Sequence, residues 1–213
     1  ANPTAAELRR GSIHANYRAI VDTSATSGGG TLSGPPTTND GKIAGREYIA
    51  TFDDGSGRQN VTAMVQVPDS FDPANPCIVT ALSSGSRNVY GAIGSSGEWG
   101  LMKGCAVAYS DKGSGSGLHT LDDDVVNRRD GTRGPVSAVG SNSLFSWIDS
   151  ARTAFASAFP NRVAFRHAHS QQNPERDWGQ NTLDAVALAF YVLNEQFGTD
   201  VPGQSGRKLR TIK

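Results

Sequence analysis

The sequence predicts an α/β fold, and three observations carry that prediction. Continuous apolar runs at residues 77–82 and 105–109 have the length and composition of strands buried in the middle of a sheet. A Gly/Ser-rich loop and a short helix at 98–103 separate them, which is the strand–helix–strand order of α/β proteins. An amphipathic pattern over 181–197 predicts a long helix. We therefore expect a mixed, mostly parallel sheet with flanking helices and long Gly-rich loops.

The first part of the chain is expected to hold one helix and a hairpin. Thr4 and Glu7 form a capping box, in which each side chain bonds the backbone N–H of the other, so a helix should follow. The Ser/Thr/Gly/Pro-rich residues 23–41 predict a loop. Residues 46–52 and 61–67 flank Asp and Gly turn residues, and the second run alternates in the manner of a strand with one buried face.

The second half is expected to hold a long loop and two helices. Residues 111–141 are Gly-rich and predict the loop, 143–159 predict a helix, and 163–165 a short strand. Residues 209–212 have the composition of the lead-in to a further strand. The buried stripe of the long helix should comprise Leu183, Val186, Ala187, Phe190, Leu193 and Phe197.

Length and composition favour one α/β domain. We divide its 213 residues into an N-terminal helix and loop (1–45), the first strands (46–110), the long loop (111–142) and helices that lead to a further strand (143–213). The 20 basic and 20 acidic residues leave no net charge, which argues against a nucleic-acid or membrane-surface partner. No apolar run approaches the roughly 18 residues of a membrane helix.

Two cysteines, Cys77 and Cys105, open the two apolar strands. If those strands are neighbours, the thiols could form a disulfide in an oxidising compartment. The alternative is a pair of small buried side chains.

The loop after the first apolar strand is a candidate for anion stabilisation. Backbone N–H groups near Gly85, Ser86 and Arg87 could hold the negative charge that develops on a carbonyl oxygen during ester hydrolysis. Small residues suit this role because they let the backbone approach a substrate closely. A tight surface turn is the alternative interpretation.

The nucleophile that such a site needs is missing. No G-x-S-x-G elbow occurs in the chain, and the other Gly/Ser clusters have the wrong spacing. His167 and His169 could bind a metal, with Glu175 or Asp177 as further ligands, but no third ligand is evident. We expect instead that both line a cleft or make local hydrogen bonds, that His119 is a surface or cleft residue, and that the chain holds no metal and no cofactor.

Three segments resemble the 3-hydroxybutyrate oligomer hydrolase family of bacterial polyester-degrading esterases. They are ALSSGSRNVYGAIG from Ala81, EWGLMKGCAVAYSDKG from Glu98 and FRHAHSQQNPERDWGQNTLDAVALAFYVLNEQFG from Phe165, and the N-terminal ANPTAAELRR also fits. A more distant likeness to tannase-type esterases lies in the strand, Gly loop and "DKG" succession. The resemblance implies the N-terminal part of an α/β-hydrolase fold that hydrolyses hydroxyalkanoate esters through Ser, Asp and His.

The resemblance also implies that the Ser/Asp/His triad lies beyond Lys213, so this chain alone should be inactive. Residues Ser84 to Arg87 would form the oxyanion side of the active site, and Ser84 would lie in the substrate cleft. Arg87 could meet the carboxylate of an oligomer, or it could form only a surface salt bridge. The expected partners are the C-terminal remainder, as a second chain, and a small ester or polyester oligomer, in a secreted or periplasmic protein. Two alternatives are a non-catalytic polymer-binding module and a metal-dependent hydrolase that uses His167 and His169.

Overall fold

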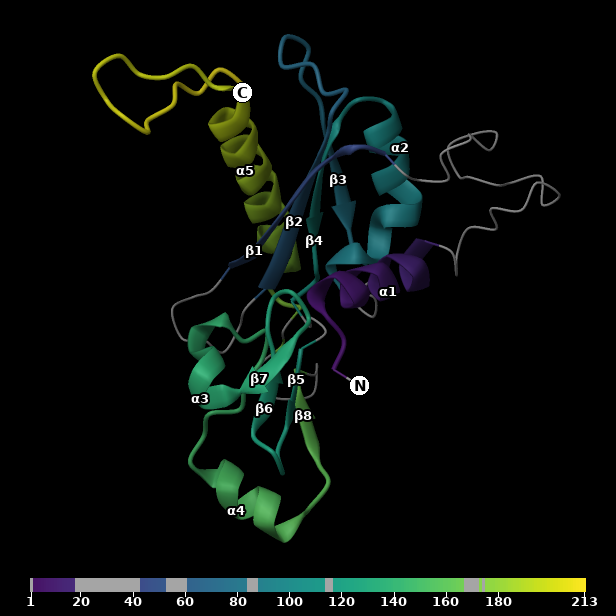
Figure 1. The fold of residues 1–213 in the computed structure, drawn as a ribbon, viewed down its shortest axis with the longest axis vertical. Coiled ribbons are helices and arrows are strands. Elements are labelled where there is room, and N and C mark those ends of the chain that lie inside the picture. The colour runs from purple at the N-terminus through teal and green to yellow at the C-terminus, as the bar shows by residue number, and fades with distance from the viewer. Residues whose placement is uncertain are drawn as a thin grey trace, which may run out of the picture.

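Four strands form the first of two sheets in the computed structural model, in the order β1-β2-β4-β3 (Figure 1). β1 (Gly45–Phe52) pairs antiparallel with β2 (Val61–Pro68), as the hairpin prediction requires, and β2 pairs antiparallel with β4 (Ala106–Ser110). β3 (Ile78–Leu82) pairs parallel with β4 and lies at the edge. The structure describes residues 2–17, 43–52, 61–83, 88–113, 117–166, 173 and 175–213.

The chain therefore combines helices and sheets as predicted, but the prediction of a mostly parallel sheet is wrong. A parallel pair needs a crossover connection, usually helical, and the connection from β3 to β4 contains helices. The connection from β2 to β3, residues 69–77, contains no helix, and β2 pairs antiparallel with β4. β1 and β2 also pair antiparallel, as a hairpin.

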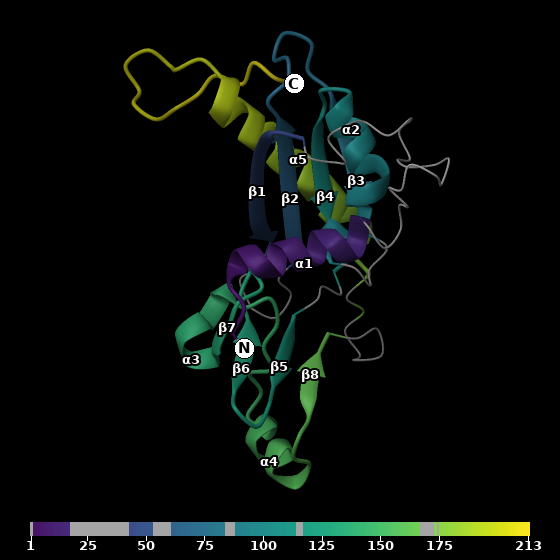
Figure 2. The same ribbon diagram turned by 45° about the vertical axis from the view of Figure 1, so that its right-hand side comes forward.

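Helices cover both faces of the first sheet (Figures 1 and 2). α5 (Trp178–Phe197) packs on one face, and η1 (Val89–Ala92), η2 (Ile93–Gly97) and α2 (Glu98–Met102) lie on the other. β2 is consequently buried on both faces, with Met64 fully enclosed, although its alternating sequence predicted one exposed face.

α1 (Ala5–Tyr17) lies between the first sheet and the lower part of the molecule (Figure 2). The capping box is confirmed: the Thr4 backbone N–H donates to Glu7 Oε2 at 2.8 Å, and the Glu7 N–H donates to Thr4 Oγ1 at 3.3 Å. Ile13 packs from α1 against the apolar cluster on the α2 face of the sheet.

A second, wholly antiparallel sheet contains much of the segment predicted as one long loop. Its strands, in the order β7-β6-β5-β8, are β5 (Leu118–Thr120), β6 (Val125–Asn127), β7 (Arg133–Pro135) and β8 (Val163–Phe165). The loop prediction for 111–141 is wrong because strands of three residues are too short to show a period of two. The prediction of a strand at 163–165 is confirmed. α3 (Val136–Val139) and η3 (Gly140–Asn142) follow β7.

The helix predicted at 143–159 is shorter in the structure. Only α4 (Ala151–Ala158) is helical, because the backbone before it bonds to the second sheet. The Trp147 N–H donates to His119 Nδ1 at 3.2 Å, whereas in a helix from residue 143 it would donate to the Ser143 carbonyl.

α5 is confirmed as the long helix, but its buried face differs from the predicted one. Ala185, Ala189, Val192 and Leu193 are buried against the first sheet, whereas Leu183 is 63% exposed. Within the described part of the chain, no helix is long and apolar enough to cross a membrane.

The last residues pack beside α5 without forming a strand. The Asn194 side chain donates to the Ile212 carbonyl at 2.9 Å and accepts from the Ile212 N–H at 3.0 Å. Ile212 is buried in the cluster under α5.

Cys77 and Cys105 form a disulfide, with a Cα–Cα distance of 4.8 Å. Each cysteine immediately precedes a strand, and β3 and β4 pair in parallel with Ile78 opposite Ala106. The disulfide therefore ties the entrances of these two strands and closes a loop that contains η1, η2 and α2.

Removing this disulfide should destabilise the fold. Because it links residues 28 positions apart, the double variant Cys77→Ala, Cys105→Ala should lose about 3 kcal/mol of unfolding free energy. Urea unfolding followed by circular dichroism measures this. The unaltered protein in reductant is the control and should show the same shift, and a midpoint unaffected by reductant would contradict the expectation.

His119 is fully buried in β5, with both ring nitrogens engaged. Nδ1 accepts the Trp147 backbone N–H at 3.2 Å, so the ring proton lies on Nε2, which is 2.9 Å from Asp124 Oδ1. Burial and the nearby charge of Arg152 lower the pKa of His119 below its usual range.

This environment makes stability depend on pH. The unfolded chain binds a proton at His119 near pH 6.5, whereas the folded chain does so only at lower pH, so stability should fall as pH drops below about 6.5. One such proton contributes a slope of at most about 1.4 kcal/mol per pH unit. Urea unfolding between pH 7.5 and 5 should show a shallower slope for His119→Gln than for the matched variant of an exposed histidine, His14→Gln. Equal slopes for the two variants would rule the explanation out.

Candidate functional site

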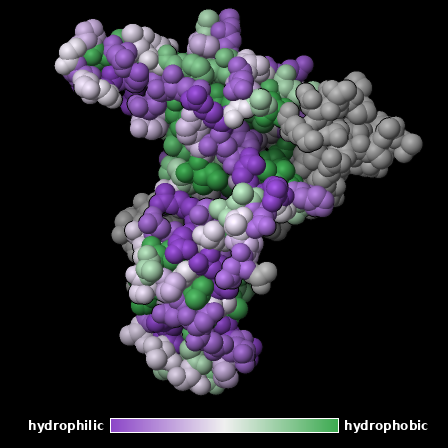
Figure 3. Space-filling view, viewed as in Figure 1, coloured by the Kyte–Doolittle hydropathy of each residue, from purple (hydrophilic) through white to green (hydrophobic). Residues whose placement is uncertain are grey.

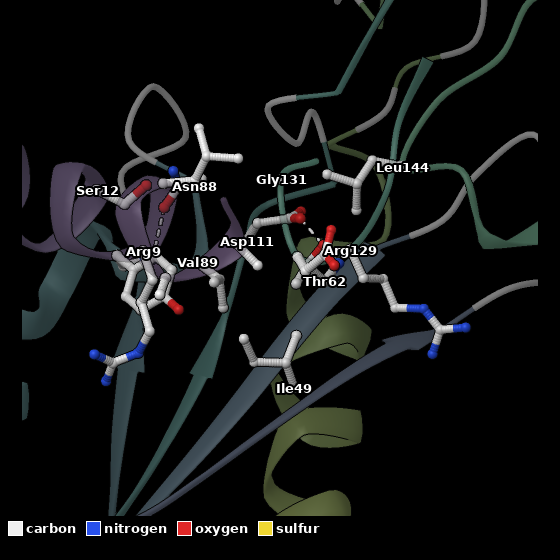
Figure 4. Close-up of a pocket in the computed structure, with 15 residues that line it drawn as sticks. Arg9, Ser12, Ile49, Thr62, Asn88, Val89, Asp111, Arg129, Gly131 and Leu144 are labelled. Carbon is white, nitrogen blue, oxygen red and sulfur yellow. Dashed lines mark hydrogen bonds between the residues drawn. The ribbon is translucent and has the colours of Figure 1, made fainter. Parts of the chain in front are cut away.

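A cavity of about 300 Å³ lies where α1, the first sheet and the second sheet meet (Figure 4). Ile49 of β1, Thr62 of β2 and Asp111 form its wall on the side of the first sheet. Asp111 directly follows the last residue of β4, so the cavity lies at the carboxyl end of that strand. Open α/β sheets bind ligands at this end, and the volume is at the lower limit of small-molecule sites.

Asp111 is the most enclosed polar group of the cavity wall, at 2% exposed. Its Oδ2 accepts the Thr62 N–H at 2.9 Å, and its Oδ1 accepts the Gly113 N–H at 2.6 Å. Burial raises the pKa of this carboxyl, while the two N–H donors and the charge of Arg166 oppose the shift. Each oxygen keeps a lone pair beyond the bond it already accepts.

Asn88 and Val89 form the wall next to the end of β3. Asn88 has a φ of 55°, and its Oδ1 accepts the Tyr90 N–H at 2.8 Å, which starts η1. Asn88 follows directly on the residues 84–87, where the sequence predicts the oxyanion loop. The cavity is therefore adjacent along the chain to the candidate anion-stabilising segment.

Arg9 attaches α1 to the first sheet beside the cavity. Its Nε and one Nη donate to the two Glu47 oxygens at 2.8 and 2.7 Å, and Gln66 and Tyr90 add bonds to the same carboxylate at 2.8 and 3.0 Å. Burial raises the pKa of Glu47, but these bonds and the charge of Arg9 outweigh it, so the pKa lies below its usual range. Glu47 thus neutralises Arg9, which lines the cavity.

Leu8 of α1 and Leu144 supply apolar surface on the remaining sides. Arg129 lies at the rim; its guanidinium donates to the Asn142 side-chain oxygen and points away from Asp111 (Figure 4). The neighbouring Asp130 also lines the cavity, and its carboxylate accepts bonds from Thr132.

His119 is the one predicted cleft residue that the structure describes, and it does not line this cavity. Residues 84–87, with Ser84, Gly85, Ser86 and Arg87, lie outside the described residues, as do His167 and His169. His119 is described but does not line the cavity, because it is buried within the second sheet. Over the described residues, no three His, Cys, Asp or Glu side chains gather as a metal site would require.

Sequence reasoning missed both acidic residues that organise this region. Asp111 carries a signal, because it is an acidic side chain directly after a buried strand, where α/β proteins place ligand-binding groups. Glu47 carries none, because its partners Arg9, Gln66 and Tyr90 are 38, 19 and 43 positions away along the chain.

Comparisons with known proteins cover the whole sequence. The family model described as 3HB-oligomer hydrolase matches residues 1–213. The chain is 60% identical over 212 residues to a D-(-)-3-hydroxybutyrate oligomer hydrolase of Burkholderia thailandensis, and 59% identical over 212 residues to proteins of the same name from Burkholderia pseudomallei and Burkholderia mallei.

Each of these alignments covers 95% of this chain and 30% of the relative, so the chain spans about a third of the length of these proteins. No solved structure matches. The family match along all 213 residues, joined to these identities, means that the chain belongs to the 3HB-oligomer hydrolase family.

Proposed function

We propose that this chain forms the substrate-binding and oxyanion side of a serine esterase that hydrolyses 3-hydroxybutyrate oligomers or related polyesters. The observation that carries the proposal is the cavity at the carboxyl end of β4, adjacent to the loop that leaves β3. The names of the curated relatives, D-(-)-3-hydroxybutyrate oligomer hydrolases, support the substrate class.

The strand order is consistent with an α/β-hydrolase sheet that continues beyond β3. In that fold, one oxyanion donor is a backbone N–H of the loop between the third strand and the following helix. The matching loop here runs from the end of β3 at Leu82 to η1, and it contains Gly85, Ser86 and Arg87. Each such donor typically contributes about 3 kcal/mol to the stability of the transition state.

The reaction would proceed by acyl transfer. A serine, activated by histidine and oriented by an acid, attacks the ester carbonyl, and the alcohol part of the oligomer leaves with the proton. Water then cleaves the acyl-serine ester and releases the acid. We place this triad in residues beyond Lys213, since no serine of this chain lies in an elbow pattern.

We also propose that the remainder of the protein covers a surface of the first sheet, as a second chain or as a continuation. Among the described strands, β3 lies at one edge of the sheet, where Leu82 is 42% exposed, and α5 presents Leu183 and Tyr191 at 63% and 62% exposed. Figure 3 shows apolar side chains open to solvent over this part of the molecule. Exposed strand edges and apolar patches normally mark an interface.

The disulfide between Cys77 and Cys105 supports a secreted or periplasmic location for the protein, because structural disulfides persist in oxidising compartments.

A serine-directed phosphonate should abolish hydrolysis of 3-hydroxybutyrate trimer by the full-length protein, and a chelator should leave it unchanged. Mass spectrometry should locate the adduct outside residues 1–213, and this chain alone should bind the inhibitor nowhere. Loss of activity with the chelator but not the phosphonate would favour the metal-dependent alternative. Binding of the trimer without any cleavage would favour the polymer-binding module.

Polar substitutions on the exposed face of α5 should weaken association with the remainder. When the two parts are produced together as separate chains, the double variant Leu183→Gln, Tyr191→Gln should reduce co-purification by at least about tenfold, because large apolar side chains dominate interface energies. Ile148→Gln, which changes a side chain 53% exposed near the second sheet, is the matched control. Equal co-purification of both variants would contradict the assignment of this face.

A further inference from the structure

The cavity wall offers a hydrogen-bond acceptor deep inside it, and the position of this acceptor bears on how a substrate lies in the cavity. Asp111 offers oxygen lone pairs deep in the wall, since over the described residues each of its oxygens accepts one N–H. In either protonation state, one of these lone pairs can accept a hydrogen bond from a ligand hydroxyl.

Among the described residues that line the cavity, no arginine faces Asp111. Arg9 is paired with both oxygens of Glu47, and the Arg129 guanidinium is directed toward Asn142 and away from Asp111 (Figure 4). Asp130 adds a second carboxylate at the rim. A ligand carboxylate would therefore meet like charge at close range, which is unfavourable in a partly desolvated site.

The apolar part of the wall suits a short branched chain. Ile49, Val89 and Leu144 line the space beside Asp111 and Thr62 (Figure 4). A methyl group and a methylene group can be buried against these side chains, each with a favourable transfer free energy of about 0.8 kcal/mol.

An oligomer of a hydroxy acid has two different ends, a neutral hydroxyl that donates a hydrogen bond and a carboxylate that only accepts. We propose that the cavity binds the hydroxyl-terminal unit, with its free hydroxyl donating to Asp111 and its methyl group against Val89 and Leu144. The inference rests on the proposed esterase function and adds the direction of the substrate: the carboxylate end extends out of the cavity.

This direction determines the product. Water is added across the ester bond next to the bound unit: its acyl carbon gains the hydroxyl, and the leaving oxygen gains the proton. One hydroxy acid is released, together with an oligomer that is one unit shorter and has a new free hydroxyl end. That end can enter the cavity in the next cycle.

The test uses the full-length protein and three synthetic trimers of (R)-3-hydroxybutyrate: the free trimer, the trimer with its hydroxyl converted to a methyl ether, and the trimer with its carboxyl converted to a methyl ester. Capping the hydroxyl should lower kcat/KM by about tenfold or more, as expected for the loss of a buried hydrogen bond to a charged group. The carboxyl methyl ester should stay within about threefold of the free trimer, because the carboxylate lies outside the cavity.

Equal losses from the two modifications, or a larger loss from the methyl ester, would overturn the direction while the esterase function stands. Absence of cleavage of all three trimers would instead overturn the proposed function on which the direction rests.

Substitutions in the cavity wall test independently whether the cavity is the substrate site. Leu144→Trp should fill the cavity and lower kcat/KM for the free trimer by about tenfold or more, whereas Ile148→Trp, four positions further along the chain and exposed, should leave it unchanged. Asp111→Asn replaces one of the two acceptor oxygens with an NH2 donor and should reduce the discrimination between the free trimer and the hydroxyl ether. Full activity of a folded Leu144→Trp protein would exclude the cavity as the substrate site.

Discussion

The carboxylate of Asp111 holds together the parts of the molecule on which the candidate site depends. Its two oxygens accept the N–H groups of Thr62, at the start of β2, and Gly113, at the exit toward the second sheet. Asp111 directly follows β4, so one side chain fixes two strands of the first sheet and the connection to the other sheet. A buried backbone N–H left without a partner costs about 1–3 kcal/mol, so both bonds also matter for stability.

The other wall of the cavity depends on a second acidic residue. Glu47 accepts bonds from Arg9, Gln66 and Tyr90, and through Arg9 it attaches α1 to the sheet. Gln66 in turn accepts the Tyr109 hydroxyl at 2.6 Å, in the layer between the sheet and η2. Since polar groups are costly when buried and unpaired, this network favours the position of α1 that pairs Arg9 with the partly buried Glu47.

Much of the fold could be predicted, because long elements carry their own sequence pattern. The apolar runs of β3 and β4, the capping box of α1 and the period of α5 are all local signals. The second sheet could not be predicted, since its strands are three residues long and are defined by pairing between β5 and β8, which are far apart along the chain. The burial of Met64 on the second face of β2 also depends on helices that pack from elsewhere.

Only the location of the candidate site along the chain could be predicted from the sequence. A loop after a buried strand indicates where an α/β protein stabilises an anion. The cavity, however, is built from α1, β1, the start of β2, Asp111 after β4, the start of η1, residues 129–131 and Leu144, which no local pattern connects. Leu183 shows the same limit of local patterns. Its place in the helical period predicts burial, but the described residues leave it exposed. Periodicity shows which side chains share the apolar face of a helix, but the width of the face that is buried depends on the surface that packs against it. The first sheet covers the part of α5 around Leu193 and leaves Leu183 exposed.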